Sequence, residues 1–253
     1  MTIGMQVTGT GEPVLLLNGL GRPMASWNAF ANKLSDRTVI TFDAPGVGTS
    51  PTLLPFSMLA LSDLAARVLD AAGCDSADVV GFSHGGAVAQ QLAADAPHRV
   101  RHLVLLSTSC GVGAVPGRGR ALWRGLLTPA AGTPRQAPDP LGLLWHILAI
   151  SSWSSIPFLG SLAAPTLVVC GRHDRIVPPA NSRLLAARIP RAELMMIDGG
   201  HDLQQPAPAV TAAALTRQYF DRREHAVTAC DNPAGHASEA QPPSQNGALH
   251  TCL

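Results

Sequence analysis

The sequence is short of charge, and the charge that it has is balanced. Of its 253 residues only 14% are charged, and the net charge is +1. No strong field therefore draws the chain to nucleic acid or to an anionic membrane. The longest apolar runs have the length of strands, below the roughly 20 residues that cross a bilayer. The first residues lack the basic and apolar regions of a secretory signal. These absences predict a cytoplasmic protein with no nucleic-acid partner and no integral membrane association.

Cysteines are few, scattered and odd in number: Cys74, Cys110, Cys170, Cys230 and Cys252. No CxxC pair and no cluster of cysteine and histidine has the spacing of a zinc site. Reduced thiols and the absence of a bound metal are the simplest expectation. Aromatic residues make up only 4% of the chain, yet four of them are tryptophans, so the positions of these tryptophans carry information.

Short apolar runs recur along the chain, and helical stretches separate them. The runs predict six strands, at residues 13–19, 38–46, 77–83, 101–108, 165–171 and 192–200. They are almost continuously apolar, as parallel strands are when both faces of the sheet are buried. Helical spacing follows at residues 61–73, 85–97 and 179–190. This alternation predicts an α/β protein with a mostly parallel, doubly wound sheet.

The alternation is interrupted once, by about fifty-five residues without a clear strand between Thr108 and Pro165. The stretch contains glycine and proline breakers and three tryptophans, and it predicts a short, mostly helical cap inserted into the fold. The end of the chain is rich in Pro, Ser, Gln and Asn, which is typical of a disordered extension. The expected organisation is a core in two parts (1–109 and 163–221), a cap (110–162) and a disordered tail (222–253).

The sharpest motif is GFSHG, from Gly81 to Gly85, between an apolar strand and a helix. A Gly-x-Ser-x-Gly sequence in that context is typical of a nucleophile elbow, a tight turn that lifts a serine hydroxyl above the sheet. The flanking glycines avoid clashes where strand and helix approach each other. The motif alone also fits an ordinary glycine-serine turn. In its strand–turn–helix context it predicts that Ser83 is a nucleophile.

A serine nucleophile needs a base, and the base needs an acid that orients it. His201, in DGGHD after the last strand, is the candidate base, and Asp174, in GRHDRIVP after the preceding strand, is the candidate acid. The order Ser, Asp, His fits the α/β-hydrolase arrangement. All three follow strands whose carboxyl ends should meet at one edge of the sheet. We therefore predict Ser83, Asp174 and His201 as a catalytic triad.

Other residues near these motifs receive simpler interpretations. Asp198 and Asp202 flank His201, but sequence neighbours rarely reach its ring. Asp43, in DAPGVGTS, is expected to shape a turn, and His173 to lie at the surface or to be structural. An acyl-transfer site also needs N–H donors for an oxyanion. The sequence offers the backbone of His84, after the nucleophile, and that of Leu20, in NGLG after the first predicted strand. An ordinary glycine turn explains NGLG equally well.

Taken together, NGLG, DAPGVGTS, GFSHGG, GRHDRIVP and DGGH resemble the α/β-hydrolase superfamily over about residues 10–220. Within it, PVLLLNGLG, FDAPGVGTSP, ILAISSWSSIPFLGSLAAPTLV and ANSRLLAARIPRAEL look like intracellular poly(3-hydroxyalkanoate) depolymerases. That resemblance implies hydrolysis of medium-chain hydroxyalkanoate esters by a Ser-His-Asp triad without a cofactor. The cap is expected after the sixth strand. The chain departs from the family in having His84 where a tryptophan is usual. Its cap is shorter between about Arg118 and Leu141, and its late start leaves room for a missing edge strand.

These observations predict an esterase that works through an acyl-enzyme on a small-molecule or polyester substrate. Trp123, Trp145 and Trp153 of the cap are candidates to line an acyl pocket, although large aromatics more often pack a core. A small-molecule esterase, thioesterase or lactonase with the same triad is the chief alternative. A non-catalytic ligand receptor on the same fold is an alternative of another class. The oligomeric state stays open, with a homodimer among the options.

Overall fold

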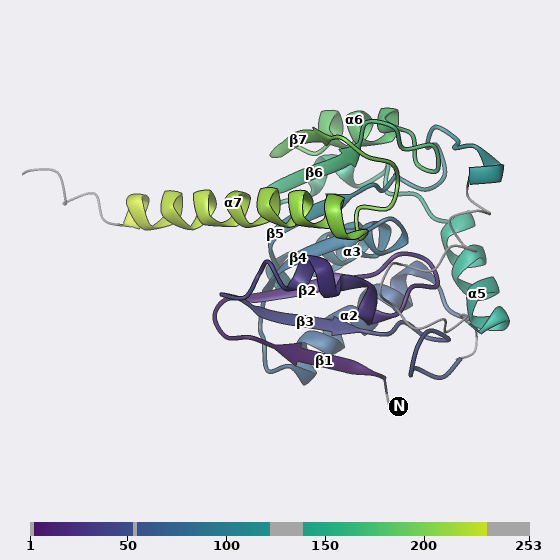
Figure 1. Cartoon of the computed structure of the whole chain (residues 1–253), viewed down its shortest axis with the longest axis horizontal. Coiled ribbons are helices and arrows are strands. Elements are labelled where there is room, and N and C mark those ends of the chain that lie inside the picture. The colour runs from purple at the N-terminus through teal and green to yellow at the C-terminus, as the bar shows by residue number, and fades with distance from the viewer. Residues whose placement is uncertain (1–2, 53–54, 122–138, 232–253) are drawn as a thin grey trace, which may run out of the picture.

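A single sheet of seven strands forms the centre of the described chain (Figure 1). The computed structural model describes residues 3–52, 55–121 and 139–231. The strands are β1 (Met5–Thr8), β2 (Pro13–Leu17), β3 (Thr38–Phe42), β4 (Ala77–Phe82), β5 (Val100–Leu106), β6 (Thr166–Gly171) and β7 (Ala192–Ile197). Their order is β1-β3-β2-β4-β5-β6-β7, and only β1 is antiparallel to its neighbour. The α/β-hydrolase fold predicted from the sequence is confirmed, with β1 as a strand that the apolar runs did not reveal.

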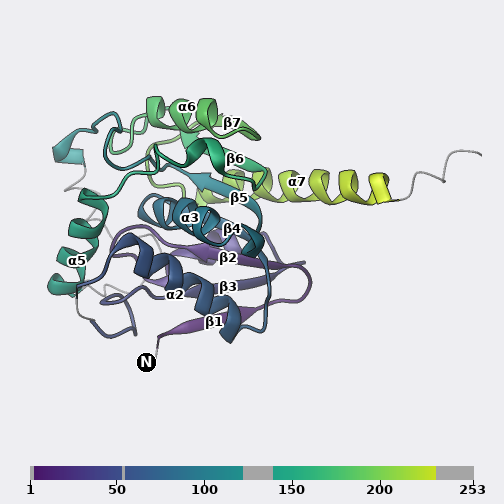
Figure 2. The same cartoon turned by 180° about the vertical axis from the view of Figure 1, so that it is seen from behind.

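Helices cover both faces of the sheet. Figure 2 shows one face, with α2 (Met58–Ala71), α3 (His84–Asp95) and α6 (Pro179–Arg188). The opposite face carries the 3₁₀ turn η1 (Met24–Trp27), α1 (Asn28–Ala31) and α7 (Pro206–Asp231) (Figure 1). Two short 3₁₀ turns, η2 (Pro97–Arg99) and η3 (Leu159–Ser161), lie in connections. No helix in the described ranges is long and apolar enough to cross a membrane.

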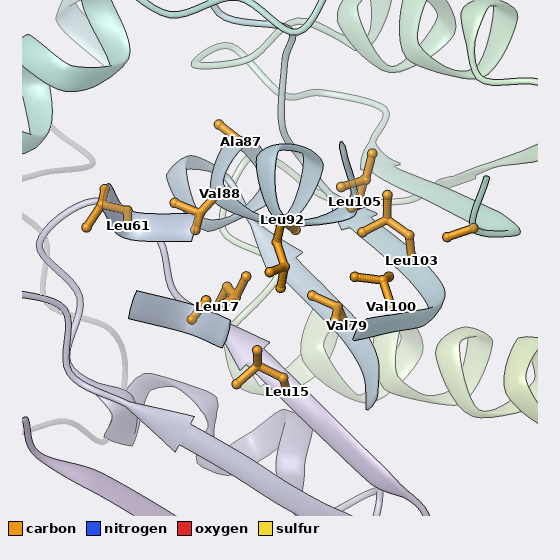
Figure 3. Packing of buried hydrophobic residues seen from close by; sticks show 14 of the residues in the cluster. Leu15, Leu17, Leu61, Val79, Ala87, Val88, Leu92, Val100, Leu103 and Leu105 are labelled. Atoms are coloured by element: carbon orange, nitrogen blue, oxygen red, sulfur yellow. The ribbon is translucent and has the colours of Figure 1, made fainter. Parts of the chain in front are cut away.

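Both faces of the sheet are packed, which explains why its central parallel strands are almost continuously apolar in sequence. Within β4, Val79 packs on the side of α2 and α3, whereas the next residue, Val80, packs with α1 and α7. In Figure 3, Leu92 of α3 lies above Leu15 and Val79 of the two central strands. Each such fully buried aliphatic side chain stabilises the fold by roughly 1.5–3 kcal/mol. This packing fixes α3, and with it the residue at its N-terminus.

The predicted cap contains helix α5 (Pro140–Ser151), which stands beyond the carboxyl ends of the parallel strands (Figure 1). The insertion was expected after the sixth strand, but it follows β5, the fifth strand in the described ranges, because only one strand, β1, precedes the strands that the apolar runs predicted. An isolated bridge between Gly111 and Ser154 closes the base of the segment. Close to this bridge in the sequence, Trp153 and Leu159 are buried in the core cluster on the α2–α3 side of the sheet. The cap is therefore anchored to the core at the edge of the sheet where the predicted triad residues lie.

Helix α7 continues to Asp231, past residue 221, where the sequence suggested that the folded part ends. The first ten residues of the predicted tail are therefore helical, and residues 232–253 lie outside the described ranges. Before that extension, Tyr219 and Phe220 are fully buried against the sheet. The helix is thus anchored as far as Phe220, and Figure 1 shows its C-terminal part extending away from the body.

Candidate active site

Ser83 lies in the tight turn between β4 and α3, with a backbone conformation rarely seen in a residue that has a side chain. Its φ is 51° and its ψ is −115°. Such conformations cost about 1–3 kcal/mol and concentrate at functional sites. A Cβ atom on Gly81 would lie 2.5 Å from the carbonyl oxygen of Gly85, and one on Gly85 would lie 2.2 Å from that of Leu17. The turn predicted as a nucleophile elbow therefore has its geometry, and the two glycines make it possible.

The contact at Gly85 gives a testable prediction. An alanine there meets the carbonyl groups of Leu17 and Asn18, which are backbone atoms and cannot rotate away. We expect Gly85→Ala to lower the free energy of unfolding by about 3 kcal/mol, because overpacking forces a backbone shift. Denaturant unfolding measures it, and Gly160→Ala is the matched control because nothing lies within 4 Å of a Cβ there. Equal stability of the two variants would contradict the close approach.

A continuous chain of hydrogen bonds joins the three predicted triad residues. His201 Nε2 lies 3.0 Å from Ser83 Oγ, and His201 Nδ1 lies 2.8 Å from Asp174 Oδ2. The other carboxylate oxygen of Asp174 accepts the N–H groups of Ile176 at 2.9 Å and Val177 at 2.8 Å. Because Asp174 accepts only, the imidazole donates from Nδ1 and leaves Nε2 to accept the serine proton. The fold thus brings Ser83, His201 and Asp174 into contact from three separate strand ends.

The neighbouring carboxylates bind elsewhere, in agreement with the sequence interpretation. Asp43 accepts the N–H groups of Met24 and Thr49 and so holds the turn after β3. Asp198 is exposed and lies 3.5 Å from His173, while Asp202 pairs with Arg22. Among these carboxylates, Asp174 is therefore the one that contacts the ring of His201.

The two predicted oxyanion donors lie at the same cavity as Ser83. Leu20 and His84 both line it, together with Gly19. His84 is the first residue of α3, where the backbone N–H groups have no partner within the helix and where the helix dipole favours negative charge. Gly19 and Leu20 follow β2 after one intervening residue, Asn18, and β2 is paired with β4 up to Leu17 and Gly81. The structure therefore brings Leu20, from the loop after β2, and His84, from the start of α3, to the cavity that Ser83 lines.

The ring of His84 packs against a second histidine, a contact that the sequence did not reveal. It lies edge-on to the ring of His146 from α5, with centroids 5.0 Å apart. Burial lowers the pKa of His84 to about 3, helped by the nearby His146. Burial also lowers the pKa of His146 to about 4, although its Nε2 lies 3.0 Å from the carbonyl oxygen of Pro45. Both rings are neutral near pH 7 and join the elbow to the cap.

The cavity at Ser83 has a volume of about 790 Å³. That size is typical of a small-molecule site. Ser83 and His201 lie in its wall, and much of the remaining lining is apolar: Leu20, Phe82, Ile147, Ile150, Ile176 and Val177. Ile147 and Ile150 come from α5, so the cap closes one side. The arrangement offers an apolar chamber to a group whose reactive atom lies at the serine.

The tryptophans proposed for this lining lie elsewhere or outside the described ranges. Trp123 belongs to the residues that the structure leaves undescribed. Trp153 is buried and donates its indole N–H to Gln91 at 2.6 Å, so it fastens the cap to α3. Neither Trp145 nor Trp153 is among the described residues that line the cavity. Their neighbours Ile147 and Ile150 take that position, and the described ranges hold no cluster of three potential metal ligands.

Comparison with known proteins identifies the family of the chain. The α/β-hydrolase fold family matches residues 12–136 and 130–208. The chain belongs to the α/β-hydrolase family. It is 37% identical to a poly(3-hydroxyalkanoate) depolymerase of Ectopseudomonas oleovorans, over 85% of this chain and 87% of that protein. This confirms the resemblance seen in the sequence motifs, and the chain is a hydrolase of this fold.

Solved structures of the family agree with the fold. The structure of Est816, described as an N-acyl homoserine lactone degrading enzyme, superposes with a TM-score of 0.73 at 30% identity, covering 85% of this chain and 95% of that one. A thermophilic esterase from Thermogutta terrifontis gives a TM-score of 0.74 at 25% identity, covering 87% and 93%. The chain thus spans nearly the whole length of these relatives.

Proposed function

We propose that this hydrolase cleaves carboxylic esters through an acyl-enzyme, with Ser83 as nucleophile, His201 as base and Asp174 as acid. The observation that carries the proposal is the hydrogen-bonded chain from Ser83 through His201 to Asp174 at the wall of an apolar cavity. A serine hydroxyl is a weak nucleophile unless a base accepts its proton. Here His201 Nε2 is within hydrogen-bond distance of that hydroxyl.

The proposed cycle has two halves. His201 takes the proton of Ser83 while Oγ forms a bond to the ester carbonyl carbon, and the carbonyl oxygen becomes an oxyanion. The N–H groups of Leu20 and His84 stabilise that charge. The tetrahedral intermediate collapses, the alcohol leaves with the proton from His201, and an acyl-serine ester remains. Water then attacks with the same base, and the acid is released. No cofactor enters either half.

Medium-chain hydroxyacyl esters, as short molecules or polyester ends, are the substrates that we favour. Ile147, Ile150 and Ile176 give the cavity an apolar wall, and its volume of about 790 Å³ is large enough for an alkyl chain of that length. The 37% identity with a poly(3-hydroxyalkanoate) depolymerase supports the same class. Lactones are the second candidate, because a lactone-degrading enzyme is 30% identical over most of the chain.

A series of p-nitrophenyl esters from acetyl to dodecanoyl tests both the reaction and the chamber. We expect turnover at every length, with kcat/KM rising towards medium chains as each added methylene contributes about 0.8 kcal/mol on burial. Ile150→Trp places a larger side chain in the cavity, so the acyl length with the highest kcat/KM should become shorter. Leu148→Trp is the matched control, because Leu148 lies on the same helix but is half-exposed and does not line the cavity.

Hydroxyacyl oligomers and acyl homoserine lactones, assayed side by side, separate the two substrate classes. A higher kcat/KM for the oligomers supports the favoured class, and a higher value for the lactones supports the second. If the protein is inert to all these esters and does not react with a fluorophosphonate probe of active serines, the proposal is wrong.

A further inference from the structure

Two loops that flank the candidate site are joined by an ion pair. Arg22 follows the loop that holds Leu20, and Asp202 follows His201. The guanidinium Nη1 and Nη2 of Arg22 donate to the two carboxylate oxygens of Asp202 at 3.2 and 2.8 Å. Both side chains line the cavity and are only 14% and 23% exposed. A bidentate pair of this kind fixes direction as well as distance, so the contact holds one loop against the other.

A second link runs parallel to the first. Asn18, the residue after β2, accepts a hydrogen bond from Gln204 Nε2 at 2.8 Å on the same oxygen that accepts the Gly19 N–H at 3.0 Å. Its side-chain nitrogen donates to the carbonyl oxygen of Pro23 at 2.6 Å. The amide of Asn18 thus brackets both ends of its own loop and ties the loop to the segment after His201.

Phe82 fills the space beneath these links. The guanidinium of Arg22 lies 5.7 Å from the centre of the Phe82 ring, and the ring of His201 lies 5.2 Å from it. A Cβ on Gly19 would lie 2.8 Å from the same ring, so the loop backbone is pressed against it. Phe82 directly precedes Ser83. One aromatic ring therefore contacts the loop of the oxyanion donor, the base and the elbow.

We infer that Arg22 and Asp202 form a clamp that positions the Leu20 N–H relative to Ser83 and His201, and that both are positioning residues of the proposed ester hydrolysis. This inference rests on the proposed function. Leu20 lies between the residues that the links hold, Asn18 and Arg22, so its backbone has little freedom while both links are intact. An oxyanion donor is effective only when it is held at the place where charge develops. The clamp supplies that restraint without touching the reacting atoms.

Breaking the Arg22–Asp202 pair should lower kcat and leave KM largely unchanged. Loosening the Leu20 loop weakens a contact that forms fully only in the transition state, while the apolar chamber still binds the acyl chain. We expect Arg22→Gln and Asp202→Asn each to lower kcat about 10-fold or more, below the 10²–10³-fold typical of removing a donor outright. Arg22→Lys, which keeps the charge, should recover part of the loss.

Arg22→Gln and Asp202→Asn together distinguish an effect of the ion pair from an effect of Asp202 on its own turn. Asp202 also accepts the N–H of Gln204 at 3.2 Å and a side-chain N–H of Gln205 at 2.9 Å within its own turn. The Asp202→Asn variant keeps an acceptor oxygen for that turn, whereas Arg22→Gln leaves the turn untouched. If the ion pair is what matters, the double variant should be no worse than either single one. Asp36→Asn, which breaks the exposed pair with Arg217, should leave kcat unchanged.

Binding of an alkyl boronic acid and hydrogen–deuterium exchange complete the experiment. The boronate forms a tetrahedral adduct on serine, so its affinity should fall in parallel with kcat in both clamp variants, and exchange at residues 19–22 should rise. Unchanged kcat, boronate affinity and exchange in both variants would overturn the inference, while Ser83-dependent turnover in the wild type would leave the proposed function standing. If the wild type hydrolyses no ester, the proposed function fails, and exchange at residues 19–22 alone decides whether the pair holds the loop.

Discussion

Ser83→Ala should lower kcat for any ester that the wild type hydrolyses by about five to six orders of magnitude. The magnitude follows from the way a triad acts as a unit, in which losing the nucleophile or the base removes nearly all covalent catalysis. The hydroxyl oxygen of Ser83 lies 3.0 Å from His201 Nε2. Alanine fits the turn as well as serine does, because the strain at φ 51° is a property of the backbone. The variant should therefore fold, and circular dichroism should superpose on that of the wild type.

His201→Ala provides the second arm of this prediction. It should cost about as much as Ser83→Ala, and the double variant should be no slower than either single variant. Single-turnover kinetics with a p-nitrophenyl ester measure all three. A matched control is His98→Ala, because His98 is an exposed residue of η2. Turnover within 10-fold of the wild type in Ser83→Ala would exclude the acyl-serine mechanism.

The sheet could be predicted from the sequence because its signal is local. The parallel strands β2, β3, β4 and β6 are almost wholly buried, so each appears in the sequence as a largely apolar run. Strand β1 left no such signal, since three of its four residues are exposed. It is defined instead by its antiparallel pairing with β3, from Met5 opposite Phe42 to Thr8 opposite Val39. A contact between distant segments of that kind has no counterpart in a short sequence window.

The proposed triad could be predicted from the sequence for a related reason. Ser83, Asp174 and His201 each follow a recognisable strand, and the carboxyl ends of parallel strands meet at one edge of a sheet. The residues that line the cavity could not be predicted in this way. Helix α5 is apolar on every side: Leu144 and Leu148 are half-exposed, Ala149 is buried, and Ile147 and Ile150 face the cavity. Its sequence therefore does not show which face turns towards the cavity. For that reason Trp145 was predicted to line the cavity, whereas Ile147 and Ile150 line it.

The contacts of Arg22 and His84 also depend on tertiary packing. Asp202 was recognisable only as a neighbour of His201, and its partner Arg22 is supplied by a loop near the start of the chain. His84 was expected to contribute only its backbone N–H. Its ring contacts His146 because the cap folds back over the elbow, which no spacing in the sequence records.

That histidine pair should make the protein unstable in mild acid. In the unfolded chain both side chains take up a proton as the pH falls below about 6.5. In the folded protein burial lowers the pKa of His146 to about 4 and that of His84 to about 3. Between these limits the unfolded state binds more protons, so the free energy of unfolding decreases as the pH falls. From pH 6.5 to 5 the two histidines together should cost about 3 kcal/mol, because each approaches a slope of roughly 1.4 kcal/mol per pH unit once the unfolded side chain is charged.

Guanidinium unfolding at a series of pH values measures this slope, and His146→Phe isolates it. Phenylalanine keeps the contact with Phe56, whose ring centre lies 4.7 Å from that of His146, but cannot be protonated. The slope between pH 6.5 and 5 should fall by about half in this variant and stay unchanged in the exposed control His98→Gln. A wild-type slope retained by His146→Phe would show that the pair does not set the acid limit. Because His146 belongs to α5 and His84 follows Ser83, acid should first loosen the cap from the elbow, and ester turnover should decline before the sheet unfolds.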